Sequence, residues 1–181
     1  MAVDEIVLPE TKPETEWVRG RALQKVSPTY SHSHLQSLLL LSVVRWVDQT
    51  QLGRFGVEWR FRVTPPGEVT RPLVPDVSYL SFQTLAADAP PAAFEVPLAA
   101  PTVAFEILSP DDKWCDVDHK TKTYLRSGAS AVVIVDPRRK RIIVHDANGT
   151  SELQPGDTFA HDAMPGFTID VAALFERAAR R

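Results

Sequence analysis

The chain has 181 residues, of which 44% are apolar, so one sizeable core and a single domain over residues 1–181 are expected. The formal charge of −3 argues against a strong, non-specific nucleic-acid binder. Cys115 is the only cysteine, which excludes an internal disulfide framework and a thiolate zinc cluster and fits a reducing cytoplasm. The longest apolar run, 38–44, is far shorter than the ~20 residues of a membrane span, and the N-terminus lacks the order of a signal peptide. We therefore expect a cytoplasmic protein without a membrane partner.

In chain order, the hydrophobic pattern predicts an α/β arrangement. Residues 16–26 are expected to form a strand pair that turns at Arg19-Gly20, and residues 31–51 a long amphipathic helix with Gly53 as its terminator. The Ala- and Pro-rich segment 83–101 has no periodicity and is expected to be a long surface loop. The other expected elements are strands at 55–63, 74–80, 103–108, 131–136 and 141–145, and helices at 117–126 and from Asp170 onward.

Two acidic residues stand in or beside predicted strands. Asp76 lies near the start of the segment Val74 to Leu80, and Glu106 lies within the strongly apolar run Val103 to Leu108. A buried carboxylate is costly unless it is paired or binds a metal, so Glu106 requires a partner. Two carboxylates near an ammonium group are typical of a site for a hard divalent cation and for phosphodiester chemistry.

The helix predicted at 117–126 supplies that ammonium group. Asp116, Lys120 and Tyr124 follow one another at intervals of four, so they share one helical face. Tyr124 is expected in the core, with its hydroxyl orienting Lys120. Charges at helical spacing are, however, also typical of a solvated face.

Each candidate has a structural alternative. Asp76 follows a proline, where an aspartate often satisfies loop amides. Glu106 can form a buried salt bridge with Lys120 that serves structure alone. His32 and His34, near the start of a helix, are more often capping or surface residues. Only the combination of Asp76, Glu106 and Lys120 favours a catalytic site.

The order of several motifs resembles the bacterial Uma-type family of putative restriction endonucleases, within the PD-(D/E)XK nuclease superfamily. The resemblance extends from Glu16 to about His145. The residues that carry it are Glu16-Trp-Val-Arg-Gly20, Ser27-Pro-Thr-Tyr-Ser-His32, Pro75-Asp76-Val77, Glu106-Ile-Leu-Ser-Pro110, Asp116-x-x-x-Lys120-x-x-x-Tyr124 and Ile134-Val-Asp-Pro137. The resemblance implies a restriction endonuclease-like core, in which helices flank a central mixed β-sheet, with an N-terminal hairpin and a long helix.

The resemblance also implies a site. In that superfamily a lysine normally stands two residues after the second acidic residue, where this chain has Leu108. The family therefore points to Lys120 as a relocated catalytic lysine. The implied ligands of Mg²⁺ or Mn²⁺ are Asp76, Glu106, the carbonyl of Ile107 and, as a third acidic ligand, Glu16. The residues with an expected accessory role are His32, Tyr124 and Asp116.

The resulting hypothesis is a metal-dependent endonuclease that hydrolyses DNA. The alternatives are a nuclease-fold scaffold or DNA-binding module that has lost cleavage, and an acidic cluster that binds a metal for structure alone. We also expect a homodimer, because two sites related by a two-fold axis cut both strands of a duplex most simply. Val57, Trp59 and Phe61 alternate with charged residues and predict an apolar strand face for this contact, beside the loop 83–101.

Overall fold

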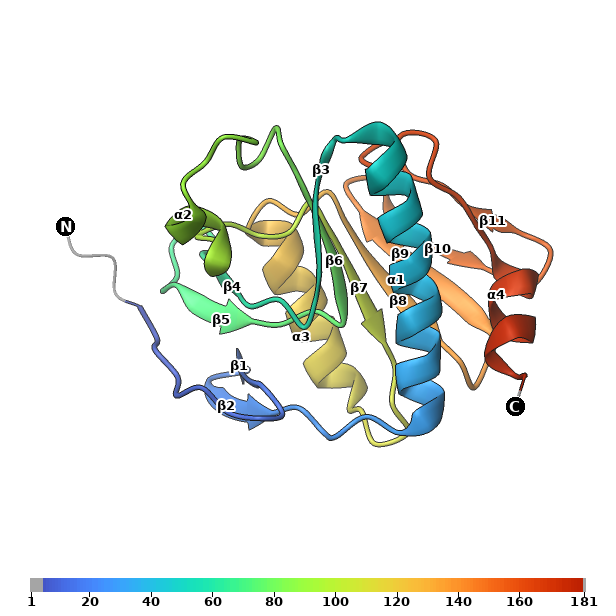
Figure 1. Ribbon diagram of the computed structural model, residues 1–181. Coiled ribbons are helices and arrows are strands. Elements are labelled where there is room, and N and C mark those ends of the chain that lie inside the picture. The colour runs from blue at the N-terminus through green and yellow to red at the C-terminus, as the bar shows by residue number, and fades with distance from the viewer. Residues whose placement is uncertain (1–4, 181) are drawn as a thin grey trace.

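The computed structural model describes residues 5–180 and is built on a six-stranded sheet with the order β10-β9-β8-β7-β6-β3 (Figure 1). Only β7 and β8 pair in parallel within it, so the sheet is mixed, as predicted. Its strands are β3 (Gly53–Val57), β6 (Val77–Ser81), β7 (Val103–Ile107), β8 (Ala131–Asp136), β9 (Arg141–Asp146) and β10 (Gly149–Leu153). Three antiparallel ribbons join β1 (Thr15–Val18) to β2 (Arg21–Gln24), β4 (Phe61–Val63) to β5 (Arg71–Leu73), and β11 (Thr158–Phe159) to β12 (Ile169–Asp170). The helices are α1 (Tyr30–Thr50), α2 (Pro91–Glu95), α3 (Trp114–Arg126) and α4 (Val171–Ala178).

Helices cover both faces of this sheet (Figure 1). One core lies between the sheet and α1 with α4, and it includes Leu39 and Phe105. The other lies on the side of α3 and includes Ala104 and Tyr124. Because side chains alternate along a strand, Glu106 points away from the α1 core and toward α3. The alternation of side chains along β7 thus places the carboxylate of Glu106 on the face of the sheet that α3 covers.

Strand β8 is buried along its whole length, as its sequence Ala-Val-Val-Ile-Val-Asp predicts. It pairs in parallel with β7, and α3 makes the crossover between them. None of the helices within residues 5–180 has the length and hydropathy required to span a lipid bilayer.

The ends of α1 differ in part from the prediction. Thr29 caps its start, where Oγ1 accepts a hydrogen bond from the amide of His32 at 3.4 Å. The helix ends at Thr50, and its C-cap residue Gln51 takes the left-handed conformation with φ of 54°, so the prediction that Gly53 terminates it was wrong. Gly53 begins β3, and a Cβ there would lie 2.3 Å from the carbonyl oxygen of Leu80. Close backbone packing therefore explains the glycine.

The single strand predicted over 55–63 is two strands in different sheets. The chain turns at Glu58, with φ of 46°, so β3 joins the edge of the central sheet and β4 pairs with β5. Phe61 is fully buried against Trp59, and the predicted continuous apolar face does not exist. Val57, 40% exposed on the edge strand, remains accessible.

The predicted loop 83–101 contains the short helix α2 and is held in place by two side chains. The guanidinium of Arg54 packs over the rings of Phe82 and Phe94, and it donates to the carbonyls of residues 85–87. The indole of Trp59 donates to the carbonyl of Phe94 at 3.1 Å. These contacts anchor the loop to the edge of the sheet.

Candidate active site

The hairpin β1–β2 brings Glu16 and Lys25 into the candidate site. Glu16 pairs with Leu23 in the hairpin register, and Lys25, two residues further, projects on the same side. The amide of Lys25 extends the pairing by donating to the carbonyl of Glu14 at 2.8 Å. Oε1 of Glu16 accepts from the amide of Val74 at 2.7 Å, which ties the hairpin to the segment that precedes β6.

Asp76 lies directly before β6, and Glu106 lies in the neighbouring strand β7. Val77 of β6 pairs with Phe105 of β7, so the two acidic residues are adjacent across the antiparallel ladder. Oδ2 of Asp76 accepts from the amide of Ile107 at 2.7 Å. Both side chains line one cavity of about 190 Å³, together with Glu16, Lys25, His32, Lys120 and the Leu108–Lys113 loop.

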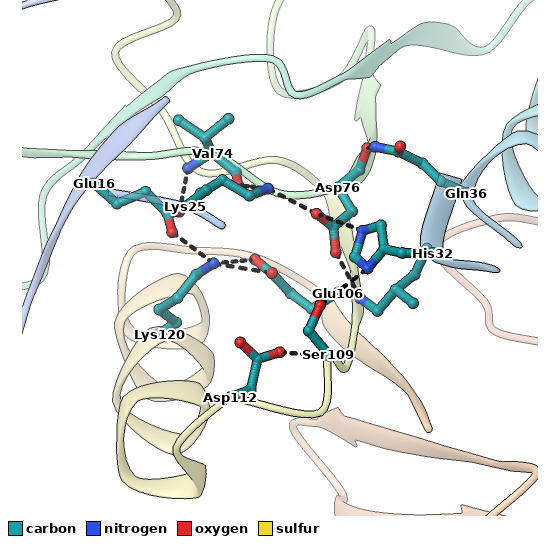
Figure 2. Close-up of polar contacts among 11 residues, drawn as sticks. Glu16, Lys25, His32, Gln36, Val74, Asp76, Glu106, Ser109, Asp112 and Lys120 are labelled. Atoms are coloured by element: carbon teal, nitrogen blue, oxygen red, sulfur yellow. Dashed lines mark hydrogen bonds and ion pairs between the residues drawn. The ribbon is translucent and has the colours of Figure 1, made fainter. Parts of the chain in front are cut away.

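Asp76 is the centre of a hydrogen-bond network (Figure 2). The ammonium of Lys25 lies 2.7 Å from Oδ1, and Nε2 of His32 lies 3.6 Å from the same oxygen. One turn after His32, the side-chain amide of Gln36 donates from Nε2 to the backbone carbonyl of Asp76 at 2.9 Å. Burial alone would raise the pKa of Asp76, but Lys25, then His32 and Lys120, outweigh it and lower this pKa. The Asp76 carboxylate is therefore held in its charged form.

Lys120 projects from α3 between two carboxylates. Its Nζ lies 2.9 Å from both oxygens of Glu106 and 2.9 Å from Oε2 of Glu16 (Figure 2). Only Oε2 of Glu106 accepts a hydrogen bond, and the buried Oε1 accepts none from residues 5–180. Burial raises the pKa of Glu106 to about 7; Lys120 opposes this, and Asp76 and Glu16 reinforce it. Lys120 has a raised pKa, because the three carboxylates outweigh the effect of its burial.

Of the residues with an expected accessory role, Asp116 lines the cavity and Tyr124 lies in the core. Asp116 lines the cavity but pairs with Arg21 at 2.9 Å and Arg19 at 3.4 Å rather than with Lys120. Tyr124 is fully buried, and its hydroxyl has no hydrogen-bond partner in the described part of the chain. No hydrogen bond joins this hydroxyl to Lys120, and the accessory role expected for Tyr124 stays a prediction.

Sequence reasoning missed Lys25 and Gln36. Two patterns pointed to them: alternation along the hairpin places Lys25 beside Glu16, and the interval of four places Gln36 with His32. His34, by contrast, is stacked on Tyr30 and does not line the cavity.

The donor set fits a hard divalent cation. Asp76, Glu16 and Glu106 supply three carboxyl groups against the two ammonium groups of Lys25 and Lys120. Oε1 of Glu106 is buried and accepts no hydrogen bond from residues 5–180. Within residues 5–180, no three Asp, Glu, His or Cys side chains are arranged to hold a metal ion as they stand. The two ammonium groups occupy the space between the carboxylates, so a cation requires them to move.

Comparisons with known proteins bear on the fold and the family of the chain. The structure is similar to the crystal structure of a "putative nuclease belonging to DUF820" from Anabaena variabilis, with a TM-score of 0.82 and 24% sequence identity over 94% of each chain. That similarity shows a shared fold. A comparison with curated proteins gave no match. A family model described as "Putative restriction endonuclease" matches residues 4–172. The chain therefore belongs to the Uma2 family, the family of that model.

Proposed function

We propose that the protein is a metal-dependent endonuclease that hydrolyses DNA phosphodiester bonds. One observation supports this most strongly: the buried Glu16 and Asp76, the largely buried Glu106 and two lysines line a single cavity on the fold of a nuclease family. A buried cluster with excess negative charge is costly for folding, which favours a functional reason for it.

In this proposal Mg²⁺ or Mn²⁺ is held by Asp76, Glu106 and the carbonyl of Ile107, with Glu16 as the third acidic ligand. A cation bound there supplies Lewis-acid chemistry, in that it lowers the pKa of a water and offsets phosphate charge. The backbone amide of Ile107 donates to Oδ2 of Asp76, and this bond holds the two proposed metal ligands beside each other.

Lys120 is the proposed catalytic lysine. Its ammonium already lies 2.9 Å from Glu106 and Glu16, and its raised pKa keeps it charged at neutral pH. The resemblance to the PD-(D/E)XK superfamily implies that Lys120, from α3, takes the role of the lysine that normally stands two residues after the second acidic residue. Its role is to orient the attacking water or to stabilise the charge that develops on the phosphate.

The basic turn Arg138 to Lys140 is a proposed contact for the DNA backbone. It follows β8, whose carboxyl end lies beside that of its parallel neighbour β7, with Ile107 opposite Val135. Arg139 is 71% exposed in its side chain, as a phosphate contact requires. This turn therefore borders the same edge of the sheet as the loop that follows Glu106.

The test is a plasmid-cleavage assay with Mg²⁺ or Mn²⁺. Lys120→Ala should lower the rate by ~10²–10³-fold, the usual loss for one charge-stabilising donor. The matched control is Lys122→Ala on the same helix, since Lys122 is 68% exposed and pairs only with Asp118 among the described residues. Equal cleavage by wild type and Lys120→Ala, or a larger loss at Lys122, would place the lysine elsewhere.

The second candidate function is a nuclease-fold module that binds DNA without cutting it. The observation in its favour is that Lys25 and Lys120 already pair with all three carboxylates, so the cluster is held together without a metal. A wild-type protein that binds DNA but releases no product with any divalent cation would support this candidate and refute the nuclease.

A further inference from the structure

Lys25 occupies the free side of the Asp76 carboxylate. Oδ2 of Asp76 is taken by the amide of Ile107, which leaves Oδ1 as the oxygen available to a ligand. The Lys25 ammonium lies 2.7 Å from Oδ1 and also donates to the carbonyl of Val74 at 3.1 Å. The lysine side chain is only 14% exposed and lines the cavity (Figure 2). Lys25 therefore stands where a cation on Asp76 would lie.

We propose that Lys25 is a built-in counter-ion of the site, whose ammonium competes with the divalent cation for Oδ1 of Asp76 and moves into the cavity when the cation binds. This inference rests on the proposed metal-dependent function. It makes Lys25 a positioning residue, which keeps Asp76 charged and in place in the metal-free protein and leaves that oxygen when the cation arrives.

Charge and geometry both require this exchange. An ammonium group 2.7 Å from Oδ1 and a divalent cation bound to the same oxygen would be like charges close together in a buried site, where water screens them poorly. The backbone of Lys25 stays fixed, because its amide is bonded to the carbonyl of Glu14 at 2.8 Å. Its four-carbon stem is flexible, so the head group moves without the hairpin. Lys120 pairs with Glu16 and Glu106 and not with Asp76, so the two lysines neutralise different carboxylates.

A purely structural role for Lys25 makes the opposite prediction. If the ammonium served only to fasten the hairpin to Val74 and Asp76, its removal would loosen the site and weaken metal binding. If it competes with the cation, its removal strengthens metal binding although the metal-free protein becomes less stable. The sign of the change in affinity separates the two roles.

The experiment titrates the full-length chain with Mn²⁺ by isothermal calorimetry. Lys25→Met keeps the alkyl stem and removes the charge, and it should lower the Kd for Mn²⁺ by roughly 10-fold or more, the scale on which groups beside a ligand alter metal affinity. Thermal unfolding in EDTA should show a lower Tm for this variant, which Mn²⁺ restores. Lys12→Met is the control, because Lys12 belongs to the segment before the hairpin, is 88% exposed and contacts Glu14 instead. An unchanged or higher Kd in Lys25→Met would overturn the proposal.

A measurement on the wild type tests the same exchange if Lys25→Met does not fold. Acylation of lysine amines, followed by mass spectrometry, should label Lys25 faster in Mn²⁺ than in EDTA, because the ammonium leaves its carboxylate. Labelling of Lys12 should be the same in both. Slower or equal labelling of Lys25 in Mn²⁺ would overturn the exchange.

The outcomes for the site and for the function are separable. Tighter Mn²⁺ binding by Lys25→Met with no DNA cleavage by wild type supports the counter-ion role and refutes the nuclease. DNA cleavage by wild type together with weaker Mn²⁺ binding by Lys25→Met supports the nuclease and refutes the counter-ion role. If neither protein binds Mn²⁺, the counter-ion proposal is overturned.

Discussion

The charge on Glu106 should destabilise the metal-free protein. Its side chain is only 12% exposed, and burial raises its pKa from the ordinary 4.5 to about 7. A carboxyl group with a raised pKa in the folded state contributes stability that is fully present below the unfolded pKa and is lost as the pH rises through the folded pKa. The difference between 4.5 and about 7 corresponds to about 3 kcal/mol at 1.36 kcal/mol for each step of pKa, lost between pH 4.5 and 7.

Glu106→Gln removes this ionisation and should stabilise the metal-free protein at pH 8. The amide keeps the shape of the protonated carboxyl group, and Lys120 keeps its pairing with Glu16 at 2.9 Å. Urea unfolding in EDTA should give a free energy of unfolding up to about 3 kcal/mol above wild type at pH 8, and nearly equal values at pH 4.5. In thermal unfolding this corresponds to a Tm higher by roughly 6–12 °C.

Asp76→Asn is the matched control with the opposite sign. The pKa of Asp76 is lowered in the folded protein, so its charge contributes stability at neutral pH that is lost as the pH falls. Asp76→Asn also leaves Lys25 without its carboxylate, and it should destabilise the protein at pH 8. The reasoning is refuted if Glu106→Gln is as destabilising at pH 8 as Asp76→Asn.

The other predictions concern metal affinity, packing and assembly. Mn²⁺ affinity should rise with pH up to about 7 and then level off, because the cation must displace the proton of Glu106; a flat calorimetric profile from pH 5.5 to 8 would contradict this. Tyr124→Phe should leave the free energy of unfolding unchanged or higher, because the buried hydroxyl has no partner among the described residues; a loss above ~1 kcal/mol would reveal one. Gly53→Ala should lower stability by ~1–3 kcal/mol in urea unfolding, since its Cβ would meet the carbonyl of Leu80 at 2.3 Å, and unchanged stability would argue against that packing. We expect a homodimer across the exposed edge of β3, and a monomeric mass in light scattering at micromolar concentration would count against it.

The sequence alone determined most of the fold, because its local patterns are strong. The continuous apolar run of β8 predicts a strand buried on both faces, and Asp170 predicts the N-cap of α4, where its Oδ1 accepts from the amide of Ala173 at 2.8 Å. The sequence also indicated the carboxylates: an acidic residue inside Val-Ala-Phe-x-Ile-Leu requires a partner, and Lys120, which the family resemblance singles out, is the residue that pairs with it.

Only the tertiary structure decided how the strand predicted at 55–63 divides and what surrounds the carboxylates. The break at Glu58 follows from a left-handed backbone that apolar alternation does not reveal. Lys25 pairs with Asp76 across 51 residues of sequence because the hairpin lies against the start of β6. Periodicity reports which side of its own element a residue faces, and it carries no information on which distant element lies opposite. The pairing of charges in this site depends on that second property, so the fold had to bring Lys25, Asp76, Glu106 and Lys120 together before their pKa values and roles were defined.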